Sequence, residues 1–129
     1  MRLLVICVGG ALGTGLRYII SRVMVQWLGP GFPYGTLAVN LLGSFVIGLV
    51  QEVGATSLLI PDTTRLFLTV GVMGGLTTYS TFSYETVRFM ESAAWYQAWG
   101  NVVLTPTVCL TACMLGIALG RQLVGLKGV

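Results

Sequence analysis

The polar positions of this chain are spaced so that long apolar stretches lie between them. Charged residues are absent from 23–51, 66–84 and 92–120, and residues 3–16 form a further uncharged stretch before Arg17. A helix that spans a bilayer needs about 20 mostly apolar residues. The pattern therefore predicts four transmembrane helices.

Loops rich in helix breakers separate these stretches. The segment LGPGFPY at 28–34 is dense in Gly and Pro and cannot continue a helix. Pro61 and Asp62 precede the third stretch, and we expect the carboxylate of Asp62 to cap that helix. The expected spans are about 3–24, 35–53, 63–90 and 96–120, in one transmembrane domain over residues 1–129.

Composition supports a membrane protein. Of the 129 residues, 55% are hydrophobic and 9% are charged, whereas soluble domains carry about 25% charged residues. The alternative for the first stretch is a signal peptide, because Arg2 precedes it. However, no small-residue cleavage site precedes a soluble domain.

The net charge of +3 does not predict nucleic-acid binding, because the basic residues are scattered singly. If the spans alternate in direction, the basic residues divide weakly between the two sides of the membrane, and a weak bias permits insertion in both orientations. An antiparallel dimer would then be possible. One side carries Arg2, Arg65, Arg121 and Lys127, and the other carries Arg22 and Arg88.

Close packing of helices is expected at three pairs of glycines. The pairs are Gly9-x-x-x-Gly13, Gly71-x-x-x-Gly75 and Gly116-x-x-x-Gly120. Small residues at this spacing let two helix backbones approach. The chain has three cysteines, Cys7, Cys109 and Cys113, and no histidine. This set predicts neither a disulfide framework nor a metal site of the usual ligand spacing. We interpret the cysteines as small buried hydrophobic residues.

The third stretch contains an unusual cluster of hydroxyl groups. Its members are Thr77, Thr78, Ser80, Thr81 and Ser83. They follow Gly74 and Gly75, and glycine is a poor helix former, so we expect the helix to break near 75–80. Hydroxyls can satisfy backbone groups that a break releases, and carbonyls at such breaks can bind cations. Hydroxyls that only bond back to an intact helix are the alternative.

Asn40 is an amide within the second apolar stretch, where an unsatisfied polar group is costly. On a helix it shares a broad face with Thr36, Gly43, Ser44 and Ile47. The Asn40 side chain could form an interhelical hydrogen bond that holds the bundle together, worth about 1 kcal/mol. It could equally be a donor to something in a pore.

Aromatic and polar positions follow the expected break. Tyr79, Phe82 and Glu85 share one flank of a helix at spacing i, i+3, i+6, and the edges of aromatic rings are electropositive. Rings packed against lipid or a neighbouring helix are the alternative. Thr105 and Cys109 form a mildly polar track on the fourth stretch.

Three strings together resemble the Fluc (CrcB) fluoride channel family. They are GGALGTGLRY at 9–18, GTLAVNLLGSF at 35–45 and GVMGGLTTYSTFSYE at 71–85. The resemblance extends over the whole chain in the number of spans, the loop lengths and the order of motifs. Tyr79 departs from the Phe usual in the family, and Cys109 stands where Ser is expected.

The resemblance implies a fold, a function and a set of site residues. It implies an antiparallel, dual-topology homodimer in a bacterial inner membrane, with two pores that release cytoplasmic fluoride passively and confer fluoride resistance. It also implies a structural sodium ion held by backbone carbonyls of Gly74 and Thr77 from both subunits. We expect the fluoride pathway to be lined by Asn40, Tyr79, Phe82, Ser83, Glu85, Thr105 and Cys109.

Two other functions compete with this one. Small multidrug transporters also have four spans, but they resemble one another in a Glu within the first span, and the first span here has no acidic residue. A membrane scaffold that only assembles partners is the second alternative. An enzyme is not expected, because no nucleophile and base pair or metal set stands out.

Overall fold

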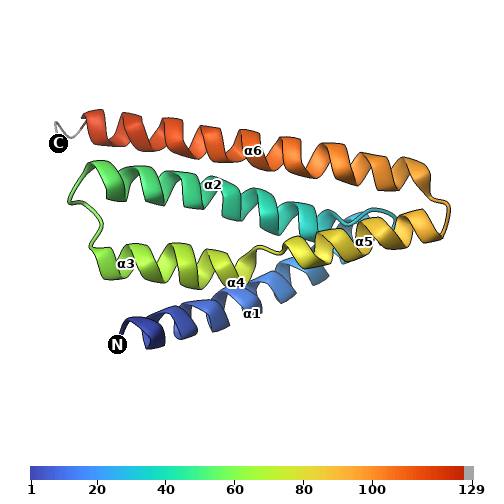
Figure 1. Cartoon of the computed structure of the whole chain (residues 1–129), viewed down its shortest axis with the longest axis horizontal. Coiled ribbons are helices and arrows are strands. Elements are labelled where there is room, and N and C mark those ends of the chain that lie inside the picture. The colour runs from blue at the N-terminus through green and yellow to red at the C-terminus, as the bar shows by residue number, and fades with distance from the viewer. Residues whose placement is uncertain (127–129) are drawn as a thin grey trace.

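The structure, a computed structural model, describes residues 1–126, and every regular element in that range is helical (Figure 1). Three helices are long: α1 (Arg2–Leu28), α2 (Tyr34–Thr56) and α6 (Trp95–Leu126). Each is long and apolar enough to cross a membrane. The all-helical membrane protein predicted from the sequence is therefore confirmed, while Lys127 lies outside the described residues.

The third apolar stretch is divided into short pieces. They are α3 (Asp62–Leu66), the π-helix η1 (Phe67–Met73), α4 (Gly74–Leu76) and α5 (Tyr79–Glu91). Thr77 and Thr78 have extended backbones, with ψ of 155° and 114°. The predicted break is confirmed. Each piece alone is shorter than a membrane span, so a fourth crossing stays a prediction.

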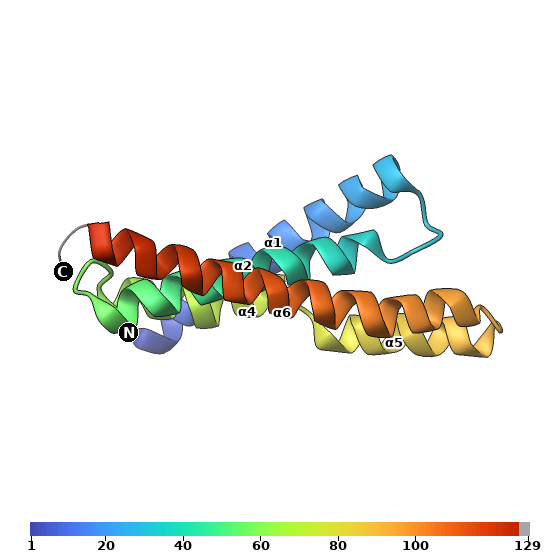
Figure 2. The ribbon, with the colours of Figure 1, turned by 90° about the horizontal axis from the view of Figure 1, so that it is seen from above.

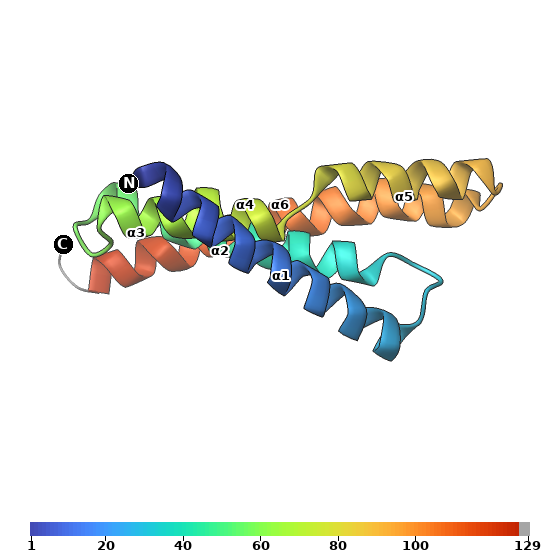
Figure 3. The same ribbon diagram turned by 90° about the horizontal axis from the view of Figure 1, so that it is seen from below.

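The break changes the packing partner of the third segment. Before it, η1 and α4 pack against α1, and after it, α5 packs against α6. Figures 2 and 3 show α5 running beside α6, while the end of α1 diverges on the other side of α2. A straight helix could not follow both neighbours. The extended residues Thr77 and Thr78 thus redirect the chain and bring the break against α2.

Glycine sets the close approach of the helices, as the spacing predicted. A Cβ placed on Gly13 would overlap the carbonyl oxygen of Val72, and one on Gly116 would overlap the carbonyl oxygen of Phe45. These contacts hold α1 against η1 and α4, and α2 against α6. In a bilayer, such backbone proximity supplies the packing that drives helix association.

The predicted cap of the third segment is wrong. Pro61 occupies the N-cap position and no side chain caps α3. Asp62 is instead the first helical residue, and its Oδ1 accepts a hydrogen bond of 3.2 Å from Nη2 of Arg65. One turn of helix separates these oppositely charged groups, so the carboxylate meets a guanidinium rather than backbone N–H groups.

The two ends of the bundle differ chemically. The chain begins at the end where α3 begins and α6 ends (Figure 1), and Arg121 there donates to Glu52 Oε1 at 3.2 Å. Exposed aromatic side chains, Trp27, Tyr96 and Trp99, lie at the other ends of α1 and α6. Tryptophan and tyrosine favour the interface between membrane and water, so these rings are suited to that boundary.

Replacement of Gly13 by Ala should destabilise the protein by about 1–3 kcal/mol, because overpacking at a close contact forces the helices apart. The matched control is Gly15→Ala on the same helix, where a Cβ would meet nothing within 4 Å. The control should be neutral or stabilising by up to about 1 kcal/mol, since alanine favours helix more than glycine does. Thermal unfolding in detergent measures both, and equal effects would contradict the packing argument.

Candidate functional site

A cavity of about 490 Å³ lies beside the break in the third segment. We call it the break pocket. Elements α2, η1, α4, α5 and α6 all contribute to its wall. Among its lining residues are seven that the sequence marked as site residues: Asn40, Gly74, Thr77, Tyr79, Phe82, Thr105 and Cys109. The fold thus brings these residues together from three separate stretches of sequence.

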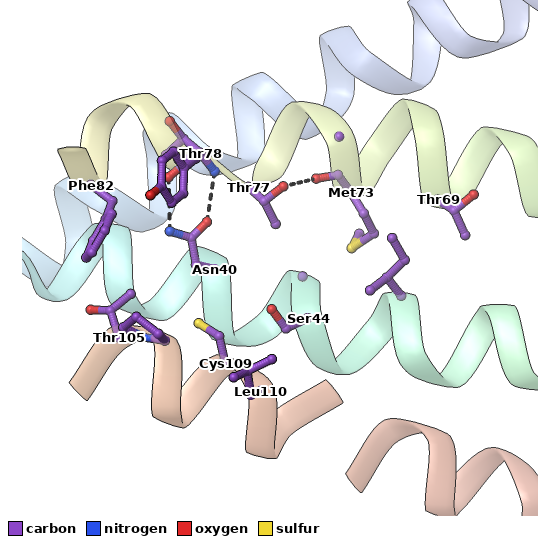
Figure 4. A pocket seen from close by; sticks show the side chains of 15 residues that line it. Asn40, Ser44, Thr69, Met73, Thr77, Thr78, Phe82, Thr105, Cys109 and Leu110 are labelled. Carbon is purple, nitrogen blue, oxygen red and sulfur yellow. Dashed lines mark hydrogen bonds between the residues drawn. The ribbon is translucent and has the colours of Figure 1, made fainter. Parts of the chain in front are cut away.

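Asn40 binds the broken backbone directly (Figure 4). Its Nδ2 donates to the carbonyl oxygen of Thr78 at 3.1 Å, and its Oδ1 accepts from the Thr78 N–H at 2.8 Å. Both backbone groups of Thr78 are therefore hydrogen-bonded to Asn40, although the residue itself has an extended backbone between α4 and α5. Asn40 thus links α2 to the third segment through hydrogen bonds, which is the structural role considered from the sequence. An amide nitrogen carries two protons, and only one of those of Asn40 is engaged by residues 1–126.

The hydroxyl cluster makes two kinds of contact with the backbone. The hydroxyl and the backbone N–H of Thr77 both donate to the carbonyl oxygen of Met73, one turn earlier in the chain. Thr78 Oγ1 accepts from the N–H of Thr81 and caps α5. Ser83 Oγ bonds back to the carbonyl oxygen of Tyr79. The Thr78 hydroxyl therefore satisfies a backbone N–H next to the break, as predicted, whereas those of Thr77 and Ser83 bond back to the preceding helical turn, as in the alternative.

The two aromatic rings after the break differ in exposure. Phe82 is buried, whereas the side chain of Tyr79 is 80% exposed. Their ring centroids lie 5.6 Å apart with the planes tilted by 47°. Tyr79 thus extends from the mouth of the break pocket, and Phe82 forms part of its inner wall.

A buried chain of hydrogen bonds lies behind Phe82. Thr105 Oγ1 donates to Asn101 Oδ1 at 2.8 Å, Asn101 Nδ2 donates to Thr86 Oγ1 at 2.9 Å, and Thr86 Oγ1 donates to the carbonyl oxygen of Phe82 at 2.8 Å. A hydroxyl has one proton, so Thr105 offers lone pairs to the break pocket in this arrangement. It can donate to an anion there once its hydroxyl rotates away from Asn101.

Glu85 lies outside the break pocket, in a second cavity of about 400 Å³. Its Oε1 accepts from Thr36 Oγ1 at 2.8 Å. Its Oε2 is buried and has no hydrogen-bond partner among residues 1–126. Thr36, Thr81 and Arg88 also line this cavity, which opens between the diverging ends of α1 and α5. Ser83 lines neither cavity.

The break has the chemistry to bind a hard cation through backbone carbonyls. Helix α4 ends at Leu76, and the last carbonyls of a helix lack partners and carry its negative dipole end. Gly74 and Thr77 both line the break pocket at this point. Within residues 1–126 no group of three His, Cys, Asp or Glu side chains could hold a metal ion. Backbone carbonyl oxygens are ligands of the kind that hard cations take.

Fold and site together define a class: a helical membrane protein with a partly polar pocket at a broken segment. The model of the CrcB-like protein family, described as Camphor Resistance (CrcB), matches residues 4–117. The chain therefore belongs to the CrcB family.

Proteins with curated names agree with this assignment. The chain is 48% identical to the "Fluoride-specific ion channel FluC" of Geobacter sp. strain M21, over 95% of this chain and 98% of that protein. It is 48% identical to the protein of the same name from Sorangium cellulosum, over 90% and 91% of the two chains. It is 40% identical to the protein of the same name from Magnetococcus marinus, over 94% of this chain and 98% of that protein. The family is one of channels, so the chain is not an enzyme.

The sequence analysis missed Asn101 and Thr86. Asn101 is fully buried and stands before two valines in an apolar helix. The reasoning applied to Asn40 would have marked it, because a buried amide needs partners. Its bond to Thr105 follows helical spacing, but the bond to Thr86 depends on how α5 packs on α6. Local sequence carries no signal for that contact.

Replacement of Thr105 by Val should lower the free energy of unfolding by about 1–3 kcal/mol, because Oδ1 of the buried Asn101 would lose its donor. The control is Thr111→Val on the same helix, whose exposed hydroxyl bonds only to the carbonyl oxygen of Thr107. The control should be close to neutral. Thermal unfolding in detergent measures both variants, and a neutral Thr105→Val would contradict a stabilising role for the bond between Thr105 and Asn101.

Proposed function

We propose that the chain is a fluoride-selective channel that lets cytoplasmic fluoride leave the cell by passive diffusion, and so confers fluoride resistance. The location we propose is the inner membrane of a bacterial cell. The observation that carries the proposal is the break pocket, in which the Asn40 amide and the Phe82 ring meet in a member of the CrcB family. Relatives named as fluoride-specific channels support the choice of ion.

The pocket suits a small anion that has lost its water shell. The second Nδ2 proton of Asn40 is available to it, and ring edges such as that of Phe82 are electropositive. Glu85 is the acidic residue nearest to Phe82 in the sequence, and it lines the second cavity rather than the break pocket. A carboxylate in the pocket itself would repel the ion, so its position beyond the pocket favours anion passage.

The remaining predicted residues extend the path on either side. Thr105 and Cys109 line the pocket on α6 and would continue the route along that helix. Glu85 would line a water-filled vestibule with Thr36. Ser83 would contribute only if its hydroxyl leaves the carbonyl of Tyr79. Tyr79 adds a hydroxyl at the mouth, where the family usually has only a ring.

The break argues for a second copy of the chain. Tyr79, Ser80 and Thr81 are exposed where the third segment is interrupted, midway along the bundle. Polar groups facing hydrocarbon are unfavourable unless another protein surface covers them. An antiparallel homodimer would place two breaks together, would contain two pores, and would follow from dual-topology insertion.

Such a dimer would also complete a sodium site. Gly74 and Thr77 of one chain supply two carbonyl oxygens at the negative end of α4, and a symmetric partner would supply two more. A structural sodium ion would then hold the two broken segments together on the symmetry axis.

Fluoride efflux from liposomes tests the proposal directly. Purified protein should release fluoride quickly and chloride not at all, and Asn40→Asp should lower fluoride release about 10- to 100-fold, since a hydrogen bond to a charged partner contributes about 1.5–3 kcal/mol. Thr111→Val, at a residue that lines neither cavity, should conduct like the natural protein. A folded protein without fluoride efflux would overturn the channel function and favour a membrane scaffold.

Sodium removal tests the metal site. Prolonged dialysis into a sodium-free, potassium-free buffer with an organic cation should lower fluoride efflux and the apparent mass by light scattering, because loss of the shared ion loosens the dimer. Addition of sodium should restore both. Unchanged efflux and mass at undetectable sodium content would contradict a structural role for the ion.

A further inference from the structure

A third cavity, of about 390 Å³, lies at the end of the bundle where the chain begins. We call it the arginine pocket. Arg2, Gln51, Asp62, Arg65 and Thr69 line it, so two guanidinium groups face one carboxylate. Neither the family match nor the relatives' names assign a role to it.

The arginine pocket adjoins the break pocket. Thr69 lines both cavities. On α2, Ile47 lines the break pocket and Gln51, one turn further on, lines the arginine pocket. Asn40, Ser44, Ile47 and Gln51 follow one face of α2 at helical spacing. A track along this face therefore runs from the Asn40 amide to the two arginines.

Arg65 is held in place on α2. Its aliphatic stem lies against Gly54, where an added Cβ would come within 2.6 Å of the arginine Cδ. Its Nη2 donates to Asp62 at 3.2 Å, but the Asp62 side chain is 81% exposed. An exposed pair of this kind contributes about 0–1 kcal/mol, and a guanidinium has five N–H donors. Arg65 can therefore bind a further anion without losing Asp62.

Arg2 adds a second positive charge to the same space. Among residues 1–126, the ion pairs of the structure do not include it. The balance of formal charge in the arginine pocket is thus positive. A cleft lined by one sign of charge concentrates ions of the opposite sign and speeds their entry.

We propose that the arginine pocket is an anion-binding mouth, through which small anions pass between water and the break pocket. The proposal rests on the channel function proposed above. Arg65 and Arg2 raise the local concentration of the ion, and Gln51 and Thr69 provide polar contacts on the way to Ile47 and the break. The ligand is a small inorganic anion in transit, fluoride in this protein.

The test compares fluoride efflux of Arg65→Gln, Arg2→Gln and the double variant with that of the natural protein, in vesicles of phosphatidylcholine. At fluoride concentrations far below saturation, the double variant should be about three- to tenfold slower. The difference should shrink at saturating fluoride and at high ionic strength, because screening weakens attraction between separated charges. Arg65→Lys keeps the charge and should slow efflux less than Arg65→Gln does, an ordering that a purely structural role of the side chain would not produce.

Arg121→Gln is the matched control, since Arg121 lies at the same end, pairs with Glu52 and lines neither cavity. It should leave efflux unchanged. The inference fails if the double variant equals the natural protein at all fluoride concentrations, or if its loss is as large at saturation. It also fails if the loss requires phosphatidylglycerol in the vesicles, which would make the site a lipid headgroup site. Absence of efflux from the natural protein would instead overturn the channel function itself.

Discussion

The two hydrogen bonds between Asn40 and Thr78 are the constraint on which the rest of the structure depends. A helix interrupted within an apolar bundle exposes backbone groups that lipid cannot satisfy. The Asn40 amide bonds to both backbone groups of Thr78, so the third segment can be broken there with those groups buried and satisfied. That break in turn lets η1 and α4 follow α1 while α5 follows α6.

The cavities are a consequence of this divided path. The break pocket forms where the third segment leaves one neighbour for the other, and the second cavity forms beyond it, where α1 and α5 diverge. The same residue that stabilises the break also lines the pocket. A substitution at Asn40 would therefore change both the support of the break and the wall of the pocket.

Polar side chains in this protein are shared between backbone and cavity. Thr77 and Thr78 satisfy the broken backbone, and Thr105 faces the break pocket while its proton is held by Asn101. The pocket thus presents a few donors whose availability depends on small rotations of hydroxyl groups. In a medium of low dielectric constant, such rotations alter the local field strongly.

The sequence by itself determined the all-helical membrane class, the glycine contacts and the break, because apolar length, small-residue spacing and hydroxyl clusters are local properties. It also marked Asn40, Phe82 and Thr105 as site residues, since polar or aromatic groups in apolar spans need a reason. Only the tertiary structure decided the π-helix, the partner of Asn101 and the separation of Glu85 from the break pocket. These depend on the relative rotation and crossing of helices, which is set by contacts between residues far apart in the chain.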